Sequence, residues 1–284
     1  MHSAGWKQIV RGWMKKDGVW KDISTPLTLE SSRVATTPST RARINIVIAS
    51  NTTSYNLLDT LNSLGTYYPG YSDITLTVNA GVVVDSDSAG GAALTVDGLT
   101  SGDSLIIVNN GTIRGRGGAG GAPGSIRTVV VGSGKNQTTT NSIVAAGSGG
   151  PGGTGLAVTY AAILENNGII RAGGGGGGGG GVSFNGSGGG QGGGGAGFGP
   201  GANAGTATAG GAGGSPYGGA GGSNGASGTA GSSAPSYTYS TGSKGQTSTV
   251  AGGAGGAGGR GGKAITGYAK LTVTVAGTIV GPIA

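Results

Sequence analysis

An uninterrupted run of glycine from residue 173 to residue 181 limits what this chain can fold into. Such a run has no side chains, so it can form neither an amphipathic helix nor a strand that packs through its side chains. It can form a polyproline-II-type helix, which has three residues per turn and rises about 3.1 Å per residue. Helices without a Cβ approach one another closely and bond through backbone N–H···O=C and Cα–H···O contacts.

A bundle of such helices is favoured over a single one. Ordering one backbone unit costs about 1–2 kcal/mol, whereas a hydrogen bond returns about 0.5–1.5 kcal/mol and a Cα–H···O contact about 0.5–1 kcal/mol. Each helix therefore needs several neighbours. We expect interior helices to be almost pure glycine, as residues 173–181 are, and outer helices to carry alanine or serine, as residues 251–262 do.

Other glycine-rich segments recur along the chain, which has 71 glycines among 284 residues. Glycine at this density is typical of disorder, but here the glycine runs alternate with segments rich in valine, isoleucine and leucine. There is no strict Gly-X-Y period, which excludes collagen. The candidate extended segments are 115–124, 147–155, 173–181, 188–201, 210–222 and 251–262.

A strand repeat organises the chain. Residues 106–115 match residues 163–172, each with an Asn-Asn-Gly centre, a looser copy closes the chain at 271–281, and an earlier relative lies at 76–84. Each unit reads as strand, turn and strand. The chain is therefore predicted to return to one base after each glycine-rich excursion.

The predicted return of the chain to one base also indicates where the connections between glycine-rich segments lie. Residues 125–146, 182–187 and 231–250 connect glycine-rich segments. If the strand repeats lie at one end, these three connections become loops that cluster at the opposite end.

The first 110 residues look like ordinary folded sequence. Residues 1–24 read as a strand–turn–strand unit around Asp17-Gly18, and its three tryptophans, Trp6, Trp13 and Trp20, are too many for so small a unit to bury. We expect them to dock on a partner and attach the chain to a fibre. Residues 25–43 read as a linker.

The predicted fold class is mostly β or irregular. It comprises an N-terminal β-hairpin attachment unit, a β-rich, β-solenoid-like base, and a bundle of packed polyglycine II helices with distal loops. The base has candidate strands in 44–114 and a possible short helix around Tyr55–Leu64. The bundle spans 115–262, interrupted by the strand repeat, and residues 263–284 supply closing strands of the base.

The chain resembles the polyglycine-sandwich tail-fibre adhesins of phages related to the T-even group. The resemblance covers roughly residues 74–284 and is carried by Asn110-Gly111-Thr112-Ile113-Arg114-Gly115-Arg116-Gly117-Gly118, by the long glycine runs, and by the ending Ala264–Tyr268 with Gly277–Pro282. It implies a phage virion protein, made in the host cytoplasm, whose N-terminal region attaches to another tail-fibre or tail-tip protein. It also implies that variable segments between the glycine motifs bind an outer-membrane protein or lipopolysaccharide.

The candidate receptor contacts lie in the three predicted loops, because a rigid scaffold positions loops for recognition and aromatic side chains supply contact area with few torsions to freeze. They are Tyr237, Tyr239, Lys244, Phe184, Asn136 and Asn141. The alternative is that these side chains only pack across the loops. Phe198 and Tyr217 lie within glycine-rich segments, where stacking on the outside of the bundle is favoured.

Other chemistry is not indicated. The chain has no cysteine and one histidine, His2, and its net charge is +7. Residues 257–264 lack the first glycine and the Ser/Thr of a phosphate-binding loop. Asp85 and Asp87 could bind Ca²⁺, but a turn capped by aspartate and serine is favoured. We therefore expect no enzyme, no cofactor, no metal, no nucleic acid and no membrane insertion, and no export signal is visible.

The alternative function is a structural tail-tip or baseplate cap that makes no receptor contact. Irregular polar and aromatic loops such as 231–250 favour an adhesin, because a cap could use short turns.

Overall fold

The computed structural model describes residues 13–16, 19–22, 41–131, 135, 137–241 and 246–284. The chain divides into two units, residues 1–38 and 39–284. In the first unit β1 (Trp13–Lys16) pairs antiparallel with β2 (Val19–Asp22). The second unit is mostly β, as the sequence predicts, with the short helix α1 (Leu57–Leu64).

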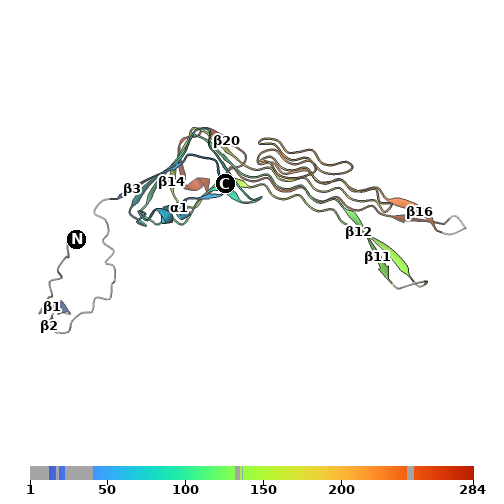
Figure 1. Ribbon diagram of the computed structural model, residues 1–284, viewed down its shortest axis with the longest axis horizontal. Coiled ribbons are helices and arrows are strands. Elements are labelled where there is room, and N and C mark those ends of the chain that lie inside the picture. Colours follow the sequence, from blue (N-terminus) through green and yellow to red (C-terminus); the bar gives the residue numbers. More distant parts are fainter. Residues whose placement is uncertain (1–12, 17–18, 23–40, 132–134, 136, 242–245) are drawn as a thin grey trace, which may run out of the picture. The chain divides into compact units, whose positions relative to one another are not determined.

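Three parallel sheets form the solenoid, the part of the second unit through which the chain coils in successive rungs (Figure 1). The first sheet is ordered β19-β14-β9-β6-β3, with bounds Leu271–Val275, Ala162–Asn166, Ser104–Asn109, Ser72–Val78 and Ala42–Ile48. The second is ordered β20-β15-β10-β7-β4, with bounds Thr278–Val280, Ile169–Arg171, Thr112–Arg114, Val83–Asp85 and Thr52–Thr53. The third is ordered β18-β13-β8-β5, with bounds Ile265–Thr266, Thr154–Val158, Ala92–Val96 and Tyr55–Asn56.

Alternation of side chains builds the core of the solenoid. In β6 the side chains of Ile74, Leu76 and Val78 are buried, while the intervening residues are half-buried, because successive strand residues point to opposite faces. β3 follows the same pattern and begins at Ala42, two residues inside the segment expected to be a linker. Leu57 and Leu61 on the inner face of α1 are fully buried with this core.

The strand repeats pair with one another in register. Ile106 and Asn109 of β9 lie opposite Ile163 and Asn166 of β14. Both asparagines are buried, and the Nδ2 of Asn109 donates to the Oδ1 of Asn166 at 2.7 Å. Asn166 in turn donates to the carbonyl of Ala276 at 2.7 Å. The first asparagine of each Asn-Asn-Gly unit thus connects a corner of one rung to the next rung.

Two glycine-rich excursions leave the solenoid at the same corner, between the second and third sheets. The first joins β10 to β13, and the second joins β15 to β18. One rung earlier, the same corner between β7 and β8 is the short link of residues 86–91. Each excursion is therefore an insertion into a solenoid rung.

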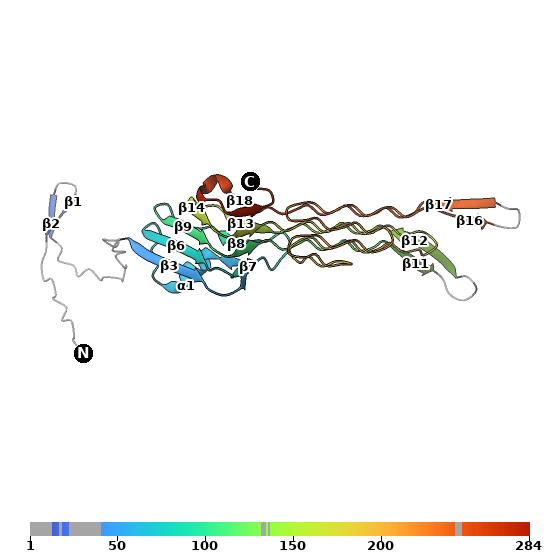
Figure 2. The same cartoon turned by 90° about the horizontal axis from the view of Figure 1, so that it is seen from above.

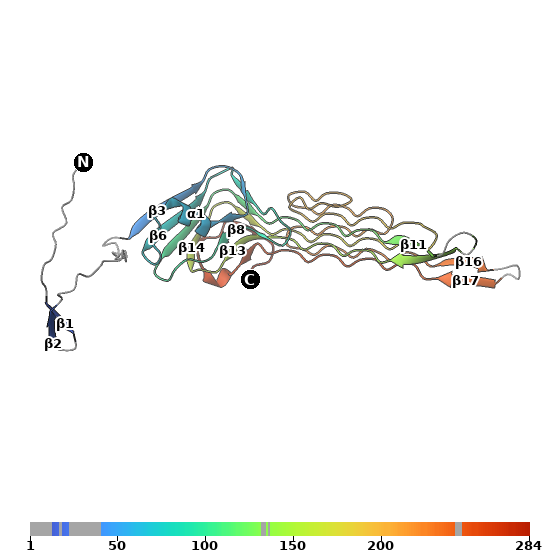
Figure 3. The same cartoon turned by 60° about the horizontal axis from the view of Figure 1, so that its bottom comes forward.

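The two excursions form the glycine bundle, in which extended segments run side by side away from the solenoid; Figure 2 and Figure 3 show this from two further directions. Residues 173–181 form its central segment, and each of their amides donates to a neighbouring segment at 2.8–3.0 Å. The neighbouring segment that accepts changes with a period of three. Gly173, Gly176 and Gly179 donate to the carbonyls of Gly153, Gly150 and Gly147 in one segment. Gly174, Gly177 and Gly180 donate to Ala196, Gly193 and Gly190 in a second, and Gly175, Gly178 and Gly181 donate to Ala226, Thr229 and Ser232 in a third.

The carbonyl groups of the central segment follow the same period. They accept from Gly262, Gly259 and Gly256, from Gly118, Gly121 and Gly124, and from Gly222 and Gly219. Six segments therefore surround the central one, which leaves no room for a side chain. A Cβ added to Gly177 would lie 2.0 Å from the carbonyl oxygen of Gly219. In the outer segment 251–262, by contrast, every third residue is exposed, beginning at Ala251.

Three details of the bundle differ from the sequence expectation. Segments 188–201 and 210–222 are not single runs, because the chain reverses at residues 197–198 and 215–217. Residues 226–234 form a further bundle segment rather than the start of a loop, with Gly228 and Gly231 donating to Gly259 and Gly256.

Candidate functional site

The distal end of the bundle, opposite the solenoid, carries two β-hairpins (Figure 1). One pairs β11 (Ser125–Val131) with β12 (Thr138–Val144), and the other pairs β16 (Tyr237–Thr241) with β17 (Gln246–Val250). These regions were expected to be loops. The β-branched residues in all four strands explain the difference, because they favour extended backbone.

The third distal connection is the turn of residues 182–187. It is closed by backbone hydrogen bonds from Ser183 to the carbonyl of Ser187 and from Gly186 to the carbonyl of Ser183, both 3.0 Å. Val182 and Ser183 are buried, and the carbonyl of Val182 accepts from the amide of Gly253 in the outer segment of the bundle. The bundle therefore fixes the base of this turn.

Three predicted contact residues form one aromatic row. Tyr237 and Tyr239 lie on the same face of β16, with ring centroids 6.2 Å apart and ring planes at 17°. Phe184 from the separate turn stacks on Tyr239 with the same centroid distance and angle. Tyr239 is 37% exposed. The structure thus joins two distal connections through a row of parallel rings.

The remaining loop predictions differ in outcome. Asn141 lies on β12, where its Oδ1 accepts from the hydroxyl of Thr128 across the hairpin at 2.8 Å. It is exposed, so the rest of its amide faces solvent. Asn136 and Lys244 lie outside the described residues.

The exposed valines of the first hairpin are not among the contact residues expected from the sequence. Val129, Val130 and Val144 are 37%, 48% and 44% exposed at the distal end. The run Thr128–Val131 carries the signal that could have found them, because consecutive β-branched residues between polar segments predict a strand.

The attachment residues can be placed only by strand register. Trp13 lies opposite Asp22 and Trp20 opposite Lys15 in the β1–β2 pair. Trp6 lies outside the described residues.

Two other features are absent from the described part of the chain. It contains no group of three or more His, Cys, Asp or Glu side chains placed to hold a metal ion. It also contains no helix long and apolar enough to cross a membrane.

The sequence profile of the family described as "Phage tail fibre adhesin Gp38" matches residues 43–282. The chain belongs to this Gp38 family of phage tail fibre adhesins. The matched residues include the solenoid, the glycine bundle and the distal end of this chain. No curated protein matches the chain closely enough to be counted as a relative.

A solved structure has the same fold as this Gp38 adhesin. It is the crystal structure of the gp37-gp38 adhesin tip complex of the bacteriophage S16 long tail fiber. The two chains are 21% identical with a TM-score of 0.52, and the alignment covers 86% of this chain and 82% of the other.

Proposed function

We propose that this phage tail-fibre adhesin recognises its host through the distal end, and that its receptor is an outer-membrane protein or lipopolysaccharide. The observation that carries this proposal is the stacked row of Phe184, Tyr239 and Tyr237. Half-exposed aromatic side chains at the end of a rigid scaffold provide contact area with little loss of conformational entropy on binding.

The proposed contact surface extends from this row to the two hairpins. Asn141 adds an exposed amide on β12, and Asn136 and Lys244 belong to the connections of the same hairpins. The single positive charge of Lys244 suits the anionic groups of a bacterial surface.

The N-terminal unit is the proposed attachment point. Trp6, Trp13 and Trp20 would dock on another protein of the tail fibre or tail tip, so that the adhesin is carried on the virion. The similar structure is a complex of gp37 with gp38, which supports a tail-fibre protein as the partner.

The glycine segments are proposed to be polyglycine II helices that span residues 115–262 as one domain, with residues 263–284 closing the base. The period of three in the hydrogen bonds of residues 173–181 supports this, because a helix with three residues per turn presents successive amides in three directions. A lattice of this kind would hold the distal connections in fixed positions.

Binding of the labelled, purified protein to a panel of Gram-negative bacteria tests the receptor proposal. The variant Tyr237→Ala/Tyr239→Ala removes two rings of the row, and Tyr71→Ala, which removes a 44% exposed tyrosine of the solenoid, serves as control. We expect selective binding of some strains, at least tenfold weaker in the double variant and unchanged in the control. Failure to bind any strain, including one that the parent phage infects, would instead support a structural cap.

A further inference from the structure

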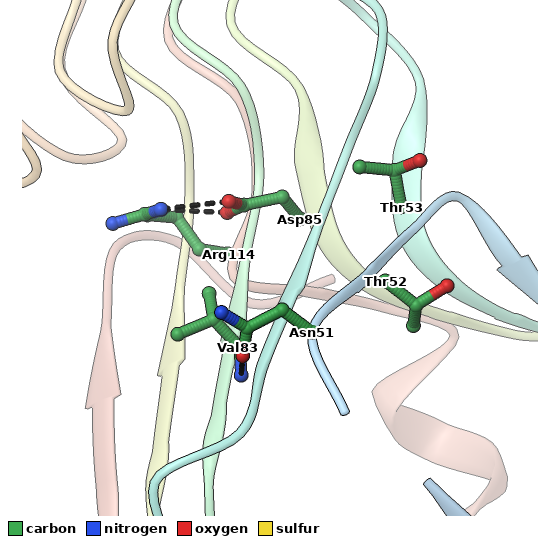
Figure 4. A pocket seen from close by; sticks show the side chains of 6 residues that line it. All are labelled: Asn51, Thr52, Thr53, Val83, Asp85 and Arg114. Carbon is green, nitrogen blue, oxygen red and sulfur yellow. Dashed lines mark hydrogen bonds and ion pairs between the residues drawn. The ribbon is translucent and has the colours of Figure 1, made fainter. Parts of the chain in front are cut away.

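A groove on the side of the solenoid, close to the corner where the excursions leave, has no assigned role. We call it the flank groove. Its larger part measures about 470 Å³ and is lined by Asn51, Thr52, Thr53, Val83, Asp85 and Arg114 (Figure 4). A smaller hollow of about 160 Å³ shares two of these residues and adds Ser86, Arg116, Gly197 and Phe198. The volume of the larger part is within the range of small-molecule sites.

A fixed ion pair forms the centre of the flank groove. Arg114 donates to both carboxylate oxygens of Asp85, each at 2.7 Å, and Figure 4 shows the two side chains pointing toward each other. Parallel register places these residues side by side on β10 and β7. A bidentate pair holds both groups in one geometry, and the carboxylate retains lone pairs that can accept further hydrogen bonds.

An exposed aromatic ring borders the smaller hollow. The Cζ of Arg114 lies 4.6 Å from the centroid of the Phe198 ring. Phe198 is nevertheless 55% exposed and has a φ of 61°. A positive φ is unfavourable for a residue with a bulky side chain, and burial of the ring does not offset it here. Residues held at an unfavourable φ concentrate at functional sites.

The groove is lined by side chains of both charges. Asp85 lies with Arg114 and Arg116 in the lining, and the Nη1 of Arg116 donates to the backbone carbonyl of the neighbouring Asp87 at 3.0 Å. The other lining side chains, Asn51, Thr52 and Thr53, are uncharged and bear amide or hydroxyl groups. The flank groove therefore combines hydrogen-bond donors and acceptors with an apolar ring, and its lining carries one more positive than negative charge.

We propose that the flank groove binds a neutral hexopyranose, as a residue of a bacterial surface glycan. The hydroxyl groups of such a sugar would donate to Asp85 and accept from the arginine and threonine side chains. Its C–H face would lie on the ring of Phe198, which satisfies both the polar and the apolar parts of the groove. This second site lies on the solenoid and does not rest on the proposed receptor site at the distal end.

Saturation-transfer NMR on the full chain tests this proposal directly. The probes are the methyl glycosides of glucose, galactose, mannose and rhamnose, with glucuronic acid and glucose 1-phosphate as anionic comparisons. We expect saturation transfer to the ring protons of at least one neutral glycoside. Phe198→Ala should reduce the affinity at least tenfold, and Tyr239→Ala at the distal end should leave it unchanged.

Phe198→Leu provides a second variant, because it keeps an apolar side chain at the turn but removes the flat ring; it should also weaken binding at least tenfold. Absence of transfer to every neutral glycoside would overturn the proposal. Full affinity in a folded Phe198→Leu protein, or binding of the two anionic sugars alone, would do so as well. Because Tyr239 is intact in both Phe198 variants, these results are independent of the cell-binding test.

Discussion

Glycine at the centre of the bundle is required by the space available rather than by backbone conformation. A Cβ on Gly177 would meet the carbonyl oxygen of Gly219 at 2.0 Å, whereas a Cβ on Gly188 would have nothing within 4 Å. We expect Gly177→Ala to lower the free energy of unfolding by about 1–3 kcal/mol or more, since the neighbouring segments must separate. Gly188→Ala is the matched control and should change it little. Denaturant unfolding measures both, and equal stability of the two variants would contradict the packing described.

The buried asparagines make a second prediction at the scale of single residues. Asn166→Ala removes the partner of both the Asn109 side chain and the carbonyl of Ala276. A buried group left without its partner costs about 1–3 kcal/mol, so we expect a loss of stability of that size. Asn167→Ala is the control, because Asn167 is exposed and its side chain donates to the side chain of Asn110 at the surface. Thermal unfolding that shifts equally in both variants would rule out a special role for the buried pair.

Tyr67 predicts a dependence of stability on alkaline pH. Partial burial, followed by the hydrogen bond to Asp103 at 2.7 Å and its negative charge, raises the pKa of the Tyr67 hydroxyl above the ordinary 10.0. A group whose pKa is raised on folding contributes stability that is present below its unfolded pKa and is lost as the pH rises through its folded pKa. The unfolding temperature should therefore fall less steeply above about pH 10 in Tyr67→Phe than in the native protein. Parallel curves for the two proteins would show that another group is responsible.

Among the elements, the hairpin of β16 and β17 carries two of the three stacked rings but contributes little to the lattice. The last hydrogen bond between bundle segments before this hairpin joins the amide of Ala234 to the carbonyl of Gly253. We expect that replacing residues 237–250 by a short Gly-Ser turn leaves the unfolding temperature within a few degrees of the native value and abolishes cell binding. Calorimetry and the cell-binding assay measure these outcomes together. Native binding after the replacement would exclude this hairpin from the receptor site.

Elements with side-chain patterns could be predicted from the sequence, and elements without them could not. The alternation in Ser72–Val78 and the repeated Asn-Asn-Gly units fix strands and their partners, because each has a face to bury. The reversals at 197–198 and 215–217 were missed, since a glycine run looks the same whether it continues or turns. Segment 226–234 was missed for the opposite reason: its glycines are few, but they recur at every third position.

The candidate site shows the same division. Tyr237 and Tyr239 lie two residues apart, so a strand places them on one face. The contact of Phe184 with Tyr239 depends on which bundle segments are neighbours, and no local pattern encodes that order. The flank groove was not anticipated either, because Asp85, Arg114 and Phe198 are brought together by strand register and by a turn at the near end of the bundle.

At the scale of the whole molecule, the solenoid should fold without the glycine bundle. Residues 115–153 and 172–264 both connect the second sheet to the third, and residues 86–91 make the same connection in the rung before. We expect a chain in which both excursions are replaced by copies of residues 86–91 to unfold cooperatively with a β-type circular dichroism spectrum. It should not bind cells. A shortened chain without a cooperative transition would show that the bundle is needed to hold the rungs together.

The period of three in the central segment restricts how the length of this adhesin can change. Removing one or two residues from a single segment would turn every later amide toward the wrong neighbour. Removing three would preserve those directions and, in the proposed polyglycine II helix, would shorten that segment by about 9 Å at a rise of about 3.1 Å per residue. We therefore expect the bundle to tolerate insertions and deletions in multiples of three, made together in adjoining segments. The distance between the distal end and the solenoid can therefore change only in discrete steps.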